Sequence, residues 1–172
     1  YSEMAAQVVG FVGKDNQGII GLEAKYDELL EGKQGKILTL TDSRGNEVES
    51  KQDRIPPEDG KNLVTTLDVV LQQYAEQTIA KAVESKGAKR GVIIMLNPQN
   101  GEIYAMANYP FFDLNDPFTM QDPELAAQWD SFSQEEKNDL LNQMWRNTAI
   151  NDTYEPGSTF KIITSSAGLE EK

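Results

Sequence analysis

The centre of the fold is decided by the stretch Gly91-Val92-Ile93-Ile94-Met95-Leu96-Asn97-Pro98-Gln99-Asn100-Gly101-Glu102. Its unbroken apolar run, residues 92–96, is typical of a strand that is covered on both faces. Residues 97–101 have the amino acids that tight hairpin turns require. We therefore expect residues 91–96 and 102–108 to pair as an antiparallel hairpin inside a sheet.

A long helix is predicted immediately before this hairpin. Apolar residues between Leu67 and Val83 recur at helical spacing, and Gly87 is a suitable C-terminal stop. The preceding residues 63–67 are predicted to form a short strand. A strand, a helix and a hairpin in this order predict an α+β fold in which an antiparallel sheet packs with helices.

The sequence after the hairpin predicts a long loop and then a second helix. Residues 109–132 are rich in Pro, Asp and Asn, and we expect them to form a loop longer than compact domains usually contain. Ser133 and Glu136 have the spacing of a capping box, which predicts a helix from there to about Trp145. We interpret Trp129 and Trp145 as packing residues, because large aromatic side chains usually belong to the core.

A separate module, rich in β-structure and turns, is predicted for residues 1–61. Its expected elements are a strand at residues 8–12, a helix at residues 23–30 ending at Gly32, and a hairpin of residues 36–41 and 47–52 around a turn at 42–46. Pro56-Pro57 and Gly60 indicate a linker. A second module should therefore span residues 62–172.

A candidate reactive site lies in Glu155-Pro156-Gly157-Ser158-Thr159-Phe160-Lys161, where a largely apolar helix is predicted to begin. Ser158 and Lys161 would lie one helical turn apart. A serine becomes a nucleophile when a base removes its proton, and a lysine acts as that base only when its amine is neutral. Burial and the positive end of the helix dipole both lower a lysine pKa. The backbone N–H of Ser158 is available to an oxyanion.

The same residues also allow a purely structural interpretation. A serine at a helix start is commonly an N-cap, and a lysine in the first turn is commonly a solvated charge. A capping box, however, needs Glu or Gln at the position of Lys161, and a cation there opposes the helix dipole. The chain contains no histidine and no cysteine, which excludes His-based triads, cysteine nucleophiles and the usual zinc sites. Nucleophilic catalysis by this segment would use lysine as the base.

The composition is that of an acidic globular protein. Of the 172 residues, 38% are hydrophobic, which is enough to build a core. The net charge of −12 argues against nucleic acids and anionic membrane surfaces as partners. No apolar run approaches the roughly 20 residues of a membrane helix. The chain begins with Tyr1, and we expect it to be part of a longer protein.

Motifs along the whole chain resemble the class B penicillin-binding proteins. In residues 62–172 the matching motifs are Asn97-Pro98-Gln99-Asn100-Gly101-Glu102-Ile103, Arg146-Asn147-Thr148-Ala149 and Tyr154-Glu155-Pro156-Gly157-Ser158-Thr159-Phe160-Lys161. In residues 1–61 they are Gly21-Leu22-Glu23, Tyr26-Asp27-Glu28-Leu29-Leu30 and Gly32-Lys33-Gln34-Gly35. The resemblance implies that residues 1–61 end a pedestal, or dimerisation, module and that residues 62–172 begin a penicillin-binding transpeptidase domain.

The resemblance also implies a serine D,D-transpeptidase that cross-links peptidoglycan in bacterial cell-wall synthesis. Ser158 would attack D-Ala-D-Ala stem peptides and form an acyl-enzyme, Lys161 would be the general base, and β-lactams would acylate the same serine. No metal or organic cofactor is implied. The parent would act at the extracytoplasmic face of the cell membrane, held by an upstream anchor, beside other cell-wall synthesis proteins. Residues 145–152 resemble sporulation and division enzymes.

Two motifs of the family, S-x-N and K-T-G, do not occur between Lys161 and Lys172. The K-T-G strand would complete the oxyanion hole, so we expect no useful turnover from this chain by itself. We also expect the helix after Ser158 to expose an apolar face, to self-associate or to be poorly ordered. Two other functions remain open. One is a serine β-lactamase or β-lactam sensor, in which S-T-F-K also occurs, and the other is a non-catalytic docking or dimerisation module.

Overall fold

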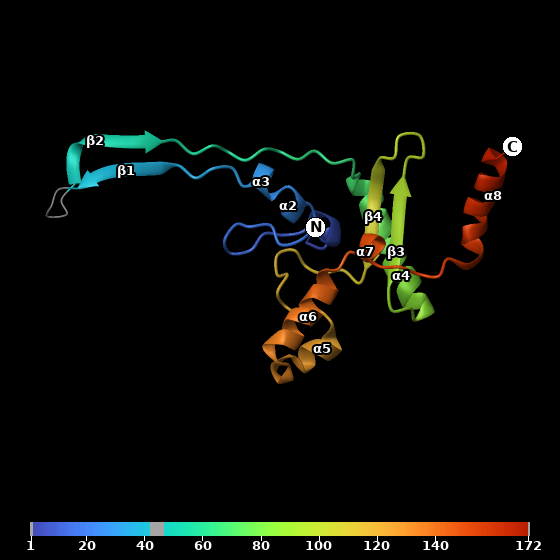
Figure 1. Ribbon diagram of the computed structural model, residues 1–172. Helices are drawn as coiled ribbons and strands as arrows, with labels where there is room; N and C mark the ends of the chain where they lie inside the picture. Colours follow the sequence, from blue (N-terminus) through green and yellow to red (C-terminus); the bar gives the residue numbers. More distant parts are fainter. Residues whose placement is uncertain (1, 42–46, 172) are drawn as a thin grey trace.

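The computed structural model describes residues 2–41 and 47–171 and has an α+β fold (Figure 1). Its regular elements, in chain order, are α1 (Ala6–Val9), α2 (Gly21–Lys25), α3 (Asp27–Leu30), β1 (Lys36–Thr41), β2 (Glu47–Ile55), α4 (Val69–Lys86), β3 (Gly91–Leu96), β4 (Ile103–Tyr109), α5 (Pro123–Ala127), η1 (Trp129–Ser131), α6 (Gln134–Trp145), α7 (Thr148–Asn151), η2 (Gly157–Phe160) and α8 (Lys161–Glu170).

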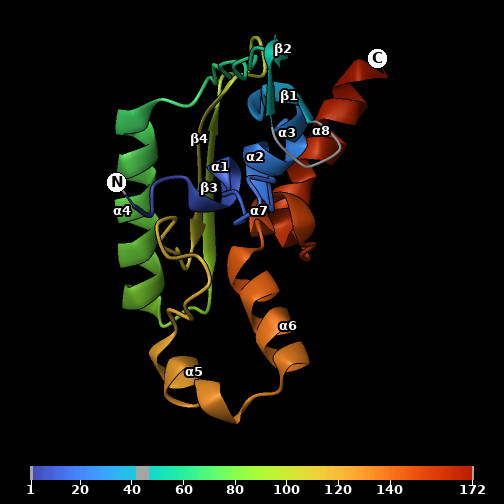
Figure 2. The same cartoon turned by 90° about the vertical axis from the view of Figure 1, so that its left-hand side faces the viewer.

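The predicted central hairpin is confirmed. β3 and β4 pair as an antiparallel two-stranded sheet with Gly91 opposite Tyr109. α4 covers one face of this sheet, while α7 lies on the other side (Figure 2). The expectation that β3 is covered on both faces is wrong for this chain, because its side chains alternate between half-buried and exposed. Val92, Ile94 and Leu96 form the exposed set.

The long helix α4 was predicted from the helical spacing of its apolar residues and from Gly87 as its C-terminal stop. The helix and its end at Gly87 are both confirmed. The Asp68 side chain accepts hydrogen bonds from the backbone N–H groups of Val70 and Leu71, which caps the first turn. Gly87 ends the helix in the left-handed conformation, with φ of 60°. The buried face of α4 packs on β4 through Ala75, Ile79, Val83, Ala105 and Ala107.

The strand predicted at residues 63–67 is not formed. This segment runs beside β4, where the Thr66 hydroxyl donates to the carbonyl oxygen of Ile103 at 2.7 Å. The next contact is from the backbone N–H of Asp68 to the carbonyl oxygen of Tyr104, at 2.9 Å. One side-chain bond and one backbone bond attach the segment to β4 without making the regular ladder of a strand.

A second core joins the N-terminal segment to the region around α6. Its buried residues are Ala6, Phe11, Phe112, Met120, Leu141 and Trp145. The strand predicted at residues 8–12 is wrong, because α1 occupies residues 6–9 and Gly10 then turns the chain with φ of 81°. Phe11 instead enters the core, where its ring packs edge-on against Trp145 at 5.0 Å between centroids. This packing outweighs the local β-preference of the two valines before it.

The predicted helix at residues 23–30 is present as two shorter pieces, α2 and α3, which meet at Tyr26. The hairpin after it is confirmed, since β1 and β2 are antiparallel and pair Lys36 with Ile55. The turn expected at residues 42–46 lies outside the described residues. Figure 1 shows the β1–β2 hairpin as an arm that extends away from the rest of the molecule.

The helix from Ser133 to Trp145 is confirmed as α6, complete with its capping box. The region 109–132 is more structured than expected, because Asp122 caps the short helix α5 and η1 follows. Both tryptophans, Trp129 and Trp145, are packing residues, as we interpreted them from the sequence. Trp145 is 8% exposed, and its Nε1–H donates to the carbonyl oxygen of Pro117 at 2.7 Å. The Trp129 ring packs edge-on against Phe132.

Candidate active site

Ser158 lies in a short 3-10 turn, and the α-helix begins only at Lys161. Gly157 opens the turn with φ of 55°, a conformation that glycine adopts without strain. The carbonyl oxygen of Pro156, the residue before the turn, accepts hydrogen bonds from both the N–H and the hydroxyl of Thr159, and these bonds stabilise the turn. The predicted helix therefore starts three residues later than expected. Ser158 and Lys161 therefore lie on either side of the junction between η2 and α8.

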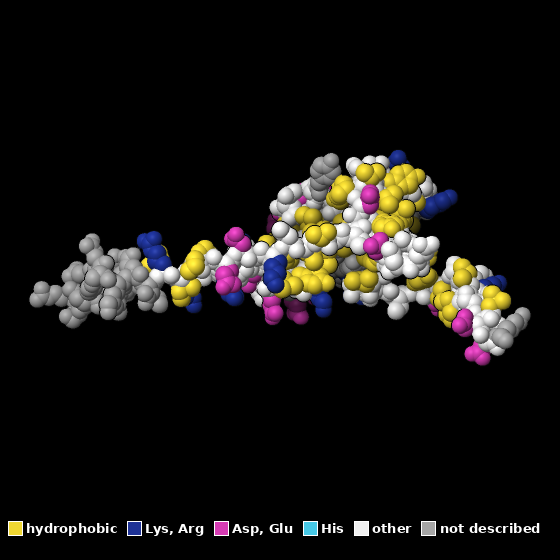
Figure 3. Space-filling model, turned by 90° about the horizontal axis from the view of Figure 1, so that it is seen from above, with side chains coloured by type: hydrophobic (Ala, Val, Ile, Leu, Met, Phe, Trp, Pro, Cys, Tyr) yellow, Lys and Arg dark blue, Asp and Glu magenta, His cyan; other side chains and the backbone are white. Residues whose placement is uncertain are grey.

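Burial of this segment, one of the two effects that could make Lys161 a base, is not found among the described residues. Ser158 and Lys161 are both exposed, and no residue of α8 is buried. The irregular residues 152–156 lead α8 away from the sheet, so no layer covers it (Figure 1). The apolar face that we expected to be bare is bare, as Figure 3 shows on the projecting C-terminal helix. Ile162 and Leu169 are each 72% exposed.

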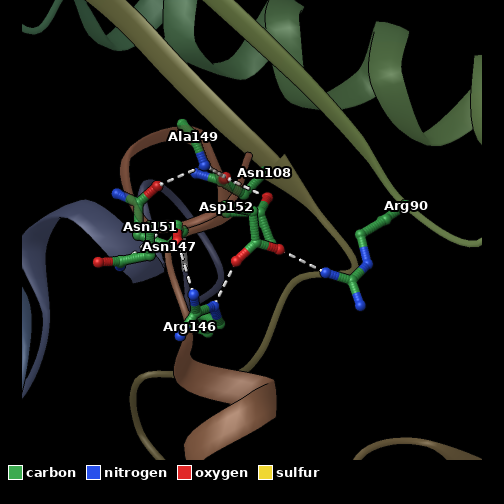
Figure 4. A network of polar contacts seen from close by, with 8 residues as sticks. Arg90, Asn108, Arg146, Asn147, Ala149, Asn151 and Asp152 are labelled. Atoms are coloured by element: carbon green, nitrogen blue, oxygen red, sulfur yellow. Dashed lines mark hydrogen bonds and ion pairs between the residues drawn. The ribbon is translucent and has the colours of Figure 1, made fainter. Parts of the chain in front are cut away.

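A polar network attaches the chain upstream of Ser158 to the rest of the fold. The carboxylate of Asp152 lies between two guanidinium groups, those of Arg90 and Arg146 (Figure 4). The Arg90 Nη1 is 2.6 Å from one carboxylate oxygen, and the Arg146 Nε donates to the other. Hydrogen bonding from Arg146, together with the charges of both arginines, lowers the pKa of Asp152 below its ordinary value against the opposing effect of burial.

A second set of contacts joins the same segment to β4. The Asn108 Oδ1 accepts hydrogen bonds from the Thr148 hydroxyl at 2.9 Å and from the Ala149 N–H at 3.0 Å. Asn147 caps α7 through its own bond from the Ala149 N–H. Asn108 is 3% exposed, and its Nδ2 is buried with no hydrogen-bond partner among the described residues. Residues 146–152 are therefore fixed to the sheet at two points.

Sequence reasoning named Ser158 and Lys161 from their spacing but missed Arg90, Asn108 and Asp152. The contacts of Asn108 and Arg90 with the segment span 40 to 62 residues of sequence. The spacing of residues within one helix or strand contains no information about contacts between residues so far apart in the sequence. The signal that pointed to this region was the motif Arg146-Asn147-Thr148-Ala149, and each of its four residues supplies a group to the network.

Neither a metal site nor a membrane-spanning helix is found in the part of the chain that the structure describes. Residues 2–41 and 47–171 hold no group of three or more His, Cys, Asp or Glu side chains placed to bind a metal ion. In the same ranges, no helix has both the length and the apolar composition that a membrane crossing requires.

Two family models match the chain, one in each half. The penicillin-binding protein dimerisation domain matches residues 1–65, and the penicillin-binding protein transpeptidase domain matches residues 91–172. With both modules in this order, the chain belongs to the class B penicillin-binding proteins.

Proteins of similar sequence and a solved structure of similar fold agree with this family assignment. Stage V sporulation protein D of Bacillus subtilis is 37% identical over 174 residues, which cover 100% of this chain and 24% of that protein. Peptidoglycan D,D-transpeptidase FtsI of Buchnera aphidicola is 32% identical over 100% of this chain and 27% of that protein. The structure of penicillin-binding protein 3 of Mycobacterium tuberculosis complexed with ampicillin has a TM-score of 0.66 at 29% identity, covering 98% of this chain and 29% of that one. The chain thus spans about a quarter of the length of these curated relatives.

Proposed function

We propose that the protein containing this chain is a serine D,D-transpeptidase that cross-links peptidoglycan. The observation that carries the proposal is the placement of Ser158 and Lys161 at the junction of η2 and α8, inside the match to the transpeptidase domain. A relative at 32% identity bears the name peptidoglycan D,D-transpeptidase, which supports the same activity. Residues 1–61 would end the pedestal module and residues 62–172 would begin the catalytic domain.

The proposed chemistry uses Ser158 as nucleophile and Lys161 as general base. The Ser158 hydroxyl loses its proton to the Lys161 amine and attacks the carbonyl of the penultimate D-alanine. The terminal D-alanine leaves with a proton, and an acyl-enzyme remains. An acceptor amine from a second stem peptide then attacks the ester and releases Ser158. A β-lactam would be attacked by the same hydroxyl, and a related structure was solved with ampicillin.

The base must be neutral at the moment of attack, so Lys161 needs a drier surrounding than this chain provides. Both Lys161 and Ser158 are exposed here, and residues 162–172 contain no S-x-N or K-T-G motif. The 172-residue chain by itself is therefore proposed to have no useful turnover. Stoichiometric labelling of Ser158 by a fluorescent penicillin in the isolated chain would contradict this.

The parent protein is proposed to act on stem peptides at the outer face of the bacterial membrane. Its partners would be peptidoglycan and other cell-wall synthesis proteins, with β-lactams as covalent inhibitors. The similarity to a stage V sporulation protein and to FtsI supports a role in sporulation or division.

The test is acylation of the longer protein by a fluorescent penicillin. Ser158→Ala should abolish labelling, whereas Ser165→Ala, a matched change on the following helix α8, should leave it unchanged. Lys161→Met should lower the acylation rate by about 10²- to 10⁴-fold, the usual contribution of a general base. Labelling that survives in Ser158→Ala would refute the assignment.

The two other functions give different results in the same assay. A β-lactamase would release the label rapidly by hydrolysis, and a non-catalytic module would not be labelled. The match of residues 1–65 to a dimerisation domain supports the transpeptidase over the β-lactamase.

A further inference from the structure

Residues 152–156, between α7 and the turn that contains Ser158, form no regular structure. Residues 153–160 are exposed, so packing does little to fix their position. Asp152 is the point where this segment is attached. It is half-buried, its backbone N–H bonds to Thr148, and its carboxylate binds Arg90 and Arg146.

The two arginines extend from rigid parts of the molecule. Arg146 follows Trp145, the buried end of α6. Arg90 precedes Gly91, which lies so close to α4 that an added Cβ would be 2.5 Å from the Cδ1 of Ile79. The carboxylate of Asp152 therefore joins the end of α6 to the start of β3 at the last fixed point before Ser158 (Figure 4).

We propose that Asp152 is a positioning residue for the nucleophile, which it holds in place by fixing the start of the segment that leads to Ser158. This inference rests on the proposed function. With Asp152 attached, residues 153–157 are free and can reach roughly 17 Å at about 3.4 Å per residue. If Asp152 is released, the last attached residue is Asn151, the end of α7, whose carbonyl oxygen accepts a hydrogen bond from the Arg146 Nη2. The free segment then gains one residue, can reach roughly 20 Å, and is no longer held by Arg90 at the start of β3.

The effect should appear in local order and in the chemical step. Ion pairs between partly exposed groups contribute little to global stability. A nucleophile displaced by about an ångström, in contrast, can lose a hundredfold in rate. Loss of the Asp152 attachment should thus lower the acylation rate without unfolding the protein.

The test compares Asp152→Asn and Asp152→Glu with Asp139→Asn, which changes an exposed aspartate on α6. In the 172-residue chain, Asp152→Asn should raise amide exchange of residues 150–152, whose N–H groups bond to the carbonyl oxygens of Asn147 and Thr148, about tenfold, with other segments unchanged. In the longer protein it should lower the first-order acylation step by about 10- to 100-fold while penicillin affinity is kept. Asp152→Glu should restore part of both effects, and Asp139→Asn should show neither.

The failures can be told apart. If the wild-type protein is not acylated at Ser158, the proposed function is wrong. If the wild type is acylated and Asp152→Asn is acylated at the same rate, or if exchange of residues 150–152 does not change, the positioning role is wrong. A loss confined to penicillin affinity would also refute it, because Asp152 would then act on binding.

Discussion

At the scale of single residues, Asn108 and Asp152 link the catalytic candidate to the fold. Asn108 is buried in β4 and accepts two hydrogen bonds from α7. Asp152 is half-buried and pairs with two arginines. The first residue is expected to affect the stability of the chain, whereas the second mainly affects the order of one segment.

Asn108→Ala should destabilise the chain by about 1–3 kcal/mol, because the Thr148 hydroxyl and the Ala149 N–H lose a buried acceptor. Urea unfolding followed by tryptophan fluorescence measures this. The control is Asn142→Ala on the exposed side of α6, expected to change stability by at most about 0.5 kcal/mol. Equal stability of the two variants would show that the Asn108 contacts are dispensable.

The pKa of Asp152 should lie below its ordinary value, and Arg146→Ala should raise it more than Arg90→Ala, because hydrogen bonding from Arg146 is the largest cause of the shift. A carboxylate with a lowered folded-state pKa adds stability above its unfolded pKa, and this is lost as pH falls through the folded value. The attachment is therefore complete at neutral pH and lost in acid. NMR titration of the carboxyl carbon checks both statements, and a pKa insensitive to Arg146→Ala would contradict them.

At the scale of elements, the helices with strong local signals were predictable and the short segments were not. α4 and α6 have caps and periodicity in their own residues, so both their existence and their ends follow from sequence. Residues 8–12 and residues 63–67 were predicted as strands from their β-branched and other apolar residues. Their conformation is set instead by contacts with Trp145 and β4, which lie far away in the sequence.

Ser133→Ala should destabilise α6 by about 1 kcal/mol, since it removes the cap of the first turn. The pKa of Glu136, which accepts bonds from the Ser133 backbone N–H and hydroxyl, should rise toward its ordinary value in this variant. Urea unfolding and NMR titration give the two quantities. Glu135→Gln, in the same turn but outside the capping box, is the control, and an equal loss there would mean that charge alone stabilises the turn.

At the scale of the whole molecule, the N-terminal segment of the matched dimerisation region packs together with the matched transpeptidase region. Phe11, from the first match, contacts Phe112, Phe118 and Trp145 of the second. The sequence indicated two modules and a linker at Pro56-Pro57, but it gave no sign that the segment around Phe11 packs under α6. Contacts of this kind depend on tertiary structure, which residue patterns do not contain.

Phe11→Ala should cost about 3–5 kcal/mol, the usual loss for a buried phenylalanine, and should weaken both regions together. Val12→Ala, at a side chain that is 42% exposed, should cost at most about 0.5 kcal/mol. Chemical unfolding monitored by tryptophan fluorescence and by circular dichroism is the measurement. Two separate transitions in the wild type would show that the regions fold independently.

The candidate site was predictable to a similar extent. Ser158 and Lys161 could be named because they lie three residues apart in the sequence. The residues that hold their segment, Arg90, Asn108 and Asp152, could not be named in this way. The exposed apolar face of α8 was expected, because an apolar helix needs a covering layer, and both Ser158 and Lys161 are exposed with it. Their catalytic roles remain predictions until the acylated residue is identified.

The most direct test of the account is to locate the acyl group after the longer protein has reacted with benzylpenicillin. Proteolysis and mass spectrometry should find one penicilloyl group per molecule, on the peptide that contains Ser158, and none in Ser158→Ala. Modification of a different residue, or no modification of a folded wild-type protein, would contradict the assignment of Ser158 as the nucleophile.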